Sequence, residues 1–399
     1  MWRTSLLLIL VLMFISASDT IAERKISVAE LRDRIMGGWV GQGVGVTFAD
    51  IYEFKSLGKI IEGDLRPWSP EMLENSLDQD DLYVDMTFIA ALEKHGPDIT
   101  YEQAGVAFGK TEYRLWHANR VARDNIRKGI MPPLSGHPRY NLCADDIDFQ
   151  IEADGIGLVC PGLPQSSNDL CEIFGSIMAY GDGKYGGMWV AAMYTQAFFE
   201  TDIKKIVTEA LKAIPAESLY SQCINDVIRW HEQYPDDWRK TWHEVEAKWN
   251  TDVNCRPGNP FNICAKLNGA YIAIALLYGN GDIARTKELA TRCGQDTDCN
   301  ASNAVGVLGA MVGLSGMDEK YKSHLPNLAG KKFSYTDYCY DTVGDACVRI
   351  AKQMIERAGG RIVMEDGEEY AYIPIQEPIP PLTFEQWPIE SKKRALGIE

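Results

Sequence analysis

Apolar residues recur at helical spacing along most of the chain. Leu31, Ile35 and Met36 begin this pattern after Ser27, which stands three residues before Glu30 as in a helix cap. Further stretches that we expect to be helical cover residues 206–214, 219–230, 283–290 and 342–357. Near the end, residues 361–364 and 370–373 flank Glu365-Asp366-Gly367-Glu368, which predicts a β-hairpin. The pattern therefore predicts an all-α, single-domain protein with a small C-terminal β-hairpin.

Two of the predicted helices carry small residues on one face. Near the start these are Gly38, Gly41 and Gly45, and in the later helix they are Gly306, Gly309, Ala310 and Gly313. A glycine inside a helix costs about 1 kcal/mol relative to alanine, so we expect close approach of another backbone to compensate. The early run lacks the Lys-Ser/Thr ending of a phosphate loop, which makes nucleotide binding the weaker interpretation.

The first 22 residues have the features of a signal peptide. Arg3 precedes an apolar run over 6–15, and small residues follow at 16–18 and at Ala22. This run is too short to span a bilayer, and no later stretch is a better candidate. We therefore expect export to the periplasm or the medium, with residues 23–399 forming one catalytic domain that ends in a proline-rich extension over 374–399.

The charge and the cysteines restrict the partners and the covalent structure. A formal net charge of −16 argues against binding to nucleic acid or to an anionic membrane. The partner that we expect is a small-molecule or glycoside substrate. Ten cysteines in an exported chain permit disulfides. Cys255 and Cys264 flank a turn, and the other candidates are Cys143, Cys160 and Cys171; the sequence leaves the pairing open, as it does the oligomeric state. The six histidines show no ligand spacing and are interpreted as structural or surface residues.

Two pairs of carboxylates open predicted helices. Asp80 and Asp81 are adjacent, and Asp296 and Asp298 are separated by one residue ahead of the small-residue helix. Carboxylate oxygens are the ligands that hard cations prefer, so the two pairs together predict a site for one or two Mg²⁺-like ions. Such ions polarise leaving groups and activate water, which is hydrolase chemistry.

Two further segments are candidates for binding the substrate. A third acidic cluster contains Asp148, one helical turn before Glu152. A glycine-rich turn over 180–187 leads into an apolar run, and such a turn brings backbone close to a ligand. We therefore name Asp148, Asp182, Tyr185 and Gly186 as candidate substrate-binding residues; plain turn chemistry is the alternative for the last three.

In their order along the chain, these motifs resemble the ADP-ribosylglycohydrolase family. The early glycines, then Asp80-Asp81, then Gly294-Gln295-Asp296-Thr297-Asp298 carry the resemblance, which covers about 26–388. It implies a compact orthogonal bundle of helices, a centre of two Mg²⁺ ions, and cleavage of an N- or O-glycosidic bond of ADP-ribose. By this resemblance Asp80, Asp81, Asp296 and Asp298 are the metal ligands, with Asp81 and Asp296 also catalytic.

The chain departs from the family pattern at three positions beside the ligands. Gln79 and Leu82 stand where the family usually has threonine, and Cys299 stands where threonine or serine is common. We expect Asp85, one turn on, to supply the missing oxygen. Two alternatives stay open: a hydrolase of another glycoside or nucleoside on the same fold, and a catalytically silent ligand-binding protein.

Overall fold

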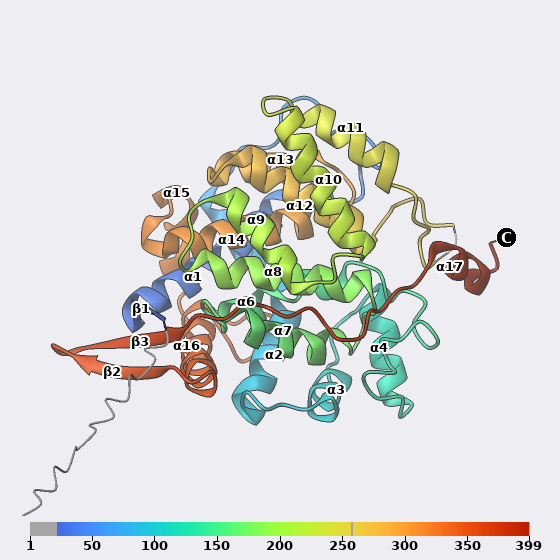
Figure 1. Ribbon diagram of the computed structural model, residues 1–399. Coiled ribbons are helices and arrows are strands. Elements are labelled where there is room, and N and C mark those ends of the chain that lie inside the picture. Colours follow the sequence, from blue (N-terminus) through green and yellow to red (C-terminus); the bar gives the residue numbers. More distant parts are fainter. Residues whose placement is uncertain (1–21, 257, 399) are drawn as a thin grey trace, which may run out of the picture.

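Helices make up most of the computed structural model, which describes residues 22–256 and 258–398. Nearly all of the predicted signal peptide therefore lies outside the described residues. The helices stack around a buried centre (Figure 1). They are α1 (Val28–Ala49), α2 (Asp80–His95), α3 (Tyr101–Gly109), α4 (His117–Arg127), α5 (Asp148–Ile151), α6 (Asp154–Leu158), α7 (Pro164–Gly175), α8 (Asp182–Ala197), α9 (Ile203–Ala210), α10 (Leu219–Gln233), α11 (Trp238–Trp249), α12 (Ala265–Gly279), α13 (Ile283–Arg292), α14 (Thr297–Gly316), α15 (Glu319–Lys322), α16 (Tyr340–Arg357) and α17 (Ile389–Leu396). Short 3₁₀ turns cover Asp50–Tyr52, Pro70–Asp78, Leu211–Ala213 and Leu325–Leu328.

The central pair of helices is α1 and α14, and their small residues face one another. A Cβ atom on Gly45 would overlap the backbone of Ala301, and one on Gly309 would overlap the backbone of Gly37. This confirms the predicted close approach and explains why alanine is avoided there. The helix α14 bends at Gly313, whose φ of 72° is in the left-handed region that favours glycine.

The chain ends form a three-stranded antiparallel sheet. The predicted hairpin is confirmed as β2 (Arg361–Glu365) and β3 (Glu368–Pro374). The strand β1 (Glu23–Ser27) pairs with β3, with Ile26 opposite Ala371, so the strand order is β1-β3-β2. The sequence pattern missed β1 because its five residues, three of which are charged, directly precede a capped helix and resemble its entry.

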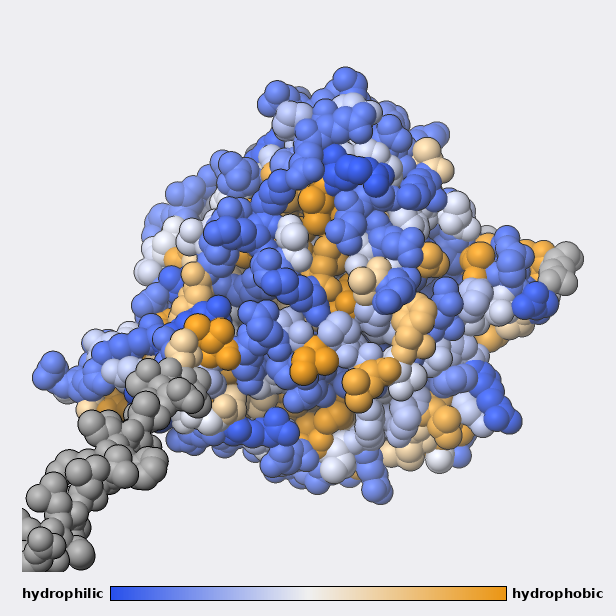
Figure 2. All heavy atoms as spheres, viewed as in Figure 1, coloured by the Kyte–Doolittle hydropathy of each residue, from blue (hydrophilic) through white to orange (hydrophobic). Residues whose placement is uncertain are grey.

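After β3 the C-terminal segment, residues 375–398, crosses the surface of the bundle and ends in α17 (Figure 1). Buried lysines form ion pairs that fasten it. Lys184 Nζ lies 2.8 Å from Glu385 Oε1, and Lys392 Nζ lies 2.7 Å from Asp145 Oδ1. Most of the surface on this side is hydrophilic, with scattered apolar patches (Figure 2). Among the described residues, no helix has the length and apolarity that crossing a membrane requires.

Candidate metal centre and substrate cavity

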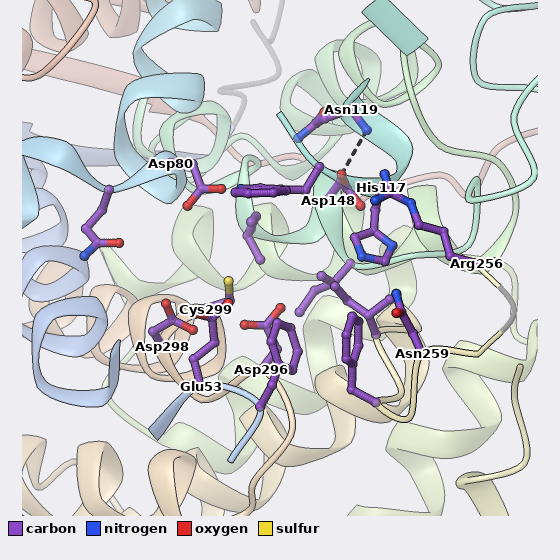
Figure 3. A pocket seen from close by; sticks show the side chains of 17 residues that line it. Glu53, Asp80, His117, Asn119, Asp148, Arg256, Asn259, Asp296, Asp298 and Cys299 are labelled. Carbon is purple, nitrogen blue, oxygen red and sulfur yellow. Dashed lines mark hydrogen bonds between the residues drawn. The ribbon is translucent and has the colours of Figure 1, made fainter. Parts of the chain in front are cut away.

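The two predicted carboxylate pairs meet at one cavity of about 450 Å³. One side of it, which we call the helical wall, consists of the N-termini of α2 and α14, where Asp80, Asp296 and Asp298 line the cavity (Figure 3) and Asp81 directly follows Asp80. The opposite side, which we call the loop wall, consists of residues 116–119, 143–148 and 253–263. The cavity is lined by Glu53, Phe54, Gln79, Asp80, Trp116, His117, Asn119, Ile147, Asp148, Ile151, Arg256, Asn259, Phe261, Ile263, Asp296, Asp298 and Cys299.

On the helical wall, α2 begins at Asp80, which faces the cavity, while Asp81 lies behind it. Asp81 is fully buried, and its Oδ1 atom has no hydrogen-bond partner among the described residues. The Sγ atom of Cys299 lies 3.6 Å from Asp81 Oδ2 in donor geometry. Cys299 therefore acts as a hydrogen-bond donor to the Asp81 carboxylate, which explains how a thiol is tolerated where an oxygen was expected.

A left-handed turn presents the second pair of carboxylates. Gly294 and Gln295 have φ values of 81° and 56°, and Gln295 N donates to Ser56 O at 2.9 Å. The side chain of Gln295 also accepts a hydrogen bond from Asn262 N at 2.9 Å, which fixes the turn. As a result Asp296 and Asp298 begin α14 with one carboxylate oxygen each, Oδ1, left without a partner among the described residues.

Electrostatics at the helical wall favour a bound cation. Burial, together with the neighbouring carboxylates, raises the pKa of Asp81 and of Asp296 well above the ordinary range. Burial also raises the pKa of Asp298, to about 6. Buried carboxylates this close together ionise at a large free-energy cost unless a positive charge offsets it. A bound cation would supply that charge.

Glu53 also faces this centre and was not predicted from the sequence. It follows the 3₁₀ turn after α1 and lines the cavity beside Asp80 and Asp298. Burial, followed by repulsion from Asp298 and Asp80, raises its pKa to about 8. A lone glutamate in a loop gives no sequence signal, so only the tertiary structure reveals it.

The loop wall supplies a different set of side chains. Asp148 lines the cavity as predicted, and its Oδ1 atom accepts a hydrogen bond from Asn119 N at 2.9 Å (Figure 3). Phe54 and Phe261 stack with their ring centroids 4.2 Å apart. His117, interpreted from the sequence as a structural or surface residue, lines the cavity, and its Nδ1 lies 2.9 Å from Asp146 Oδ2.

Four predicted residues lie away from this cavity. Asp182 accepts a hydrogen bond from Tyr220 N at 3.0 Å, and Tyr185 Oη accepts one from Glu385 N at 2.7 Å. Gly186 packs against Gln150 and Tyr220. Asp85, expected to supply an oxygen to the metals, instead accepts a hydrogen bond from Gly155 N at 2.9 Å. The glycine-rich turn therefore serves helix packing and the C-terminal segment, because α8 enters the core directly after it.

The structure decides the cysteine pairing that the sequence left open. The disulfide joins Cys143 to Cys255, which are 112 residues apart in sequence. Cys264 is a buried free thiol that directly precedes α12. Cys160 and Cys171, the other candidates, are buried free thiols as well.

Comparisons with known proteins agree with this architecture. The sequence profile of the ADP-ribosylglycohydrolase family matches residues 27–359, which include both carboxylate pairs. A solved structure described as an ADP-ribosylglycohydrolase-related protein complex has a similar fold, with a TM-score of 0.56 and 14% sequence identity. The match covers 82% of this chain and 99% of that one. No curated protein matches the chain. The chain therefore belongs to the ADP-ribosylglycohydrolase family and is a hydrolase of glycosidic bonds.

Proposed function

We propose that this protein is a Mg²⁺-dependent hydrolase of the N- or O-glycosidic bond in an ADP-ribose-like, ribosyl substrate. The observation that carries the proposal is the convergence of Asp80-Asp81 with Asp296 and Asp298 on one cavity. The pairs are more than two hundred residues apart in sequence, yet they open neighbouring helices with buried oxygens that lack partners among the described residues.

The residues present fit a hard cation. The donor atoms at the helical wall are carboxylate oxygens, and the one nearby sulfur donates to Asp81. Asp80, Asp81, Asp296 and Asp298 would hold the metal, and four carboxylates match the charge of two divalent ions. Bound there, the metal would act as a Lewis acid toward sugar hydroxyls and lower the pKa of a water molecule.

The protein's own side chains complete the chemistry. Asp296 lines the cavity, so its carboxylate is placed to orient an attacking water and accept its proton. Asp148, held by Asn119 on the loop wall, is placed to accept a hydrogen bond from a substrate hydroxyl. The positive charge of an oxocarbenium-like transition state is stabilised by carboxylates on both sides.

A glycoside or nucleoside without a pyrophosphate is the second candidate substrate. Five carboxylate residues line the cavity, whereas Arg256 is the single lysine or arginine among its lining residues. A pyrophosphate is usually bound by several cationic groups or backbone N–H donors. The aromatic and aliphatic side chains of the loop wall suit a planar base or an apolar aglycone instead.

A substrate panel tests the proposal. The mature protein is incubated with Mg²⁺ and ADP-ribosylated arginine and serine peptides, nucleosides and simple glycosides, and the released sugar is quantified by mass spectrometry. We expect turnover of a ribosyl substrate that is lost with chelator and falls at least about 100-fold in Asp296→Asn, since even outer-shell changes cost 10- to 100-fold.

Asp78→Asn is the matched control, because Asp78 is an exposed carboxylate just before α2 that lies outside the cavity. Equal activity in Asp296→Asn and wild type would refute the assigned centre. Ligand binding without any turnover across the panel would favour a silent binding protein. We also propose that the protein is exported, and N-terminal sequencing of the mature chain, expected to begin near Glu23, tests this.

A further inference from the structure

A second group of metal-ligating side chains lies at the base of the loop wall. It consists of His117, Cys143, Asp146 and Cys255, each of which offers a ligand atom within 4.8 Å of the others. They come from three separate segments: the start of α4, the turn before α5, and the loop between α11 and α12. We propose that, when its two cysteines are reduced, this group binds a zinc-type ion independently of the hydrolytic centre.

The donor set points to a borderline metal. Two thiolates, an imidazole nitrogen and a carboxylate oxygen are the ligands of tetrahedral Zn²⁺ sites, whereas Mg²⁺ prefers oxygen alone. All four residues are buried, with His117 at 6% and Asp146 at 1% exposure. A site enclosed in this way with four protein ligands is typical of a structural zinc rather than a catalytic one.

The hydrogen bonding of Asp146 independently indicates a missing ligand. Its Oδ1 atom is buried and has no hydrogen-bond partner among the described residues. Its Oδ2 atom lies 2.9 Å from His117 Nδ1 and 3.2 Å from Cys255 Sγ. One carboxylate, one imidazole and one sulfur therefore already converge, and buried polar atoms without partners are uncommon in folded proteins.

The surrounding charge also suits an occupied site. Zn²⁺ with two thiolates and one carboxylate carries a net charge of −1. Lys392 Nζ, supplied by the C-terminal segment, lies 4.0 Å from Asp146 Oδ1. Lys392 is held mainly by Asp145 and also lies 3.5 Å from Asp252 Oδ1, so it is fixed in place whether or not the metal is bound.

Occupancy requires a redox step, because Cys143 and Cys255 form a disulfide in the structure. A dithiol reductant supplies two electrons and two protons to this bond; it becomes a disulfide itself, and the protein gains two thiols. Zn²⁺ then binds the two sulfurs and displaces both thiol protons to solvent. The other eight cysteines are buried free thiols, so the described chain keeps reduced sulfur elsewhere.

The two states share one structural consequence. Either the disulfide or the metal joins the Cys255 loop, which carries Arg256 and Phe261, to the segment that precedes Asp148. His117 takes part only in the metal-bound state. The proposed site therefore joins the segments of the loop wall in both redox states, through the disulfide when oxidised and through the metal when reduced.

Cobalt spectroscopy tests the site without reference to activity. The full-length mature protein is reduced with a dithiol, separated from it under anaerobic conditions, saturated with Mg²⁺ to fill the oxygen centre, and titrated with Co²⁺. We expect thiolate-to-cobalt charge transfer and the intense visible bands of tetrahedral Co²⁺, at one ion per chain, with Zn²⁺ displacing the colour. The oxidised protein should give neither band.

Single variants separate this site from the other thiols. Cys143→Ser, Cys255→Ser and His117→Gln should each weaken Co²⁺ binding at least about 100-fold, because each removes a direct ligand. Cys264→Ser is the matched control and should bind like wild type, since it removes a neighbouring buried free thiol. Far-ultraviolet circular dichroism reports whether each variant is folded.

Three outcomes would overturn the proposal. The first is a reduced wild-type protein, folded or unfolded, that shows no charge-transfer band. The second is an equal band in Cys143→Ser and wild type. The third is loss of the band in Cys264→Ser while Cys143→Ser retains it. None of these outcomes bears on the Mg²⁺ centre, which is measured separately through Asp296→Asn.

Discussion

The two walls of the cavity are built in opposite ways. Each half of the helical wall comes from a short contiguous motif at the N-terminus of a helix. The close packing of α14 against α1 holds the motif of α14 in place. The loop wall comes from three separate segments: the start of α4, the turn that leads into α5, and the loop between α11 and α12. Its fastenings are long-range: a disulfide across 112 residues and an ion pair between Lys392 and Asp145 across 247.

Under the proposed function, this difference separates the metal-binding side of the cavity from the substrate-binding side. Metal ligands need fixed geometry, and packed helices with touching backbones provide it. A substrate-binding surface tolerates more variation, and loops tied at a few points provide that. The ties of the loop wall include the C-terminal segment, which lies beyond residue 359, where the family match ends.

Removing the lysine that fastens the loop wall should have the largest effect on stability. Lys392 is fully buried among Asp145, Asp146 and Asp252. Lys392→Met leaves these carboxylates without their cation, and we expect a loss of about 3–5 kcal/mol in the free energy of unfolding, measured in urea. Lys393→Met, which removes a partly exposed neighbour, should change it by less than about 0.5 kcal/mol. Similar small losses in both variants would contradict a fastening role for α17.

The second-largest loss of stability should follow from a larger side chain at the contact between α1 and α14. Gly45→Ala places a methyl group on the backbone of Ala301, near the start of α14. We expect a loss of about 3 kcal/mol in the free energy of unfolding, together with weaker Mg²⁺ binding in isothermal titration, because α14 must shift. Gly316→Ala, at the exposed end of α14, is the control and should leave Mg²⁺ binding unchanged. Unaltered Mg²⁺ binding in Gly45→Ala would show that the helical wall is less rigid than its packing indicates.

A buried lysine behind the helical wall should make stability depend on pH. Lys287 is 4% exposed, and its Nζ lies 3.5 Å from the ring centre of Phe48. Burial lowers its pKa from 10.5 to about 7. Between these values the unfolded chain holds a proton that the folded chain lacks, so stability rises with pH across that window.

We expect the free energy of unfolding to rise by about 2 kcal/mol from pH 7 to pH 9 in wild type. Lys287→Met should remove this rise, and Lys331→Met, at an exposed lysine, should retain it. Urea unfolding at each pH measures the difference. A rise that persists in Lys287→Met would assign the effect to other groups. The two buried lysines differ in their surroundings: Lys392 has carboxylate partners, whereas Lys287 has aromatic neighbours.

The smallest effect concerns recognition at the loop wall. Phe261→Ala removes one ring of the Phe54–Phe261 stack. For the substrate that the panel identifies, we expect KM to rise about 10-fold with little change in kcat, since stacking contributes about 1–3 kcal/mol to binding. Phe384→Ala, at an exposed ring outside the cavity, is the control. A fall in kcat with KM unchanged would place Phe261 in the chemical step. It would contradict the assignment of the loop wall to substrate recognition alone.

The sequence was informative where a local pattern dictates local structure. Asp80-Asp81 and Asp296-x-Asp298 could be recognised because carboxylates are favoured at helix N-termini. Gly45 and Gly309 could be recognised because helix interiors otherwise avoid glycine. Asp182 and Tyr185 lie outside the cavity, and their pattern could not show this, because a glycine-rich turn looks the same whether it binds a ligand or packs against another segment. Glu53 and His117 carry no spacing signal, and the cysteine pairing is not encoded in sequence distance.

By itself the sequence determined an all-α fold, its C-terminal hairpin, and the two acidic motifs that form the helical wall. Helix periodicity and helix-end chemistry are properties of consecutive residues, so they can be read without the fold. Only the tertiary structure decided that Asp81 and Cys299 meet, that His117 and Arg256 face the same cavity, and that Cys143 pairs with Cys255. Those contacts depend on how remote loops are brought together, and packing of the whole chain determines that.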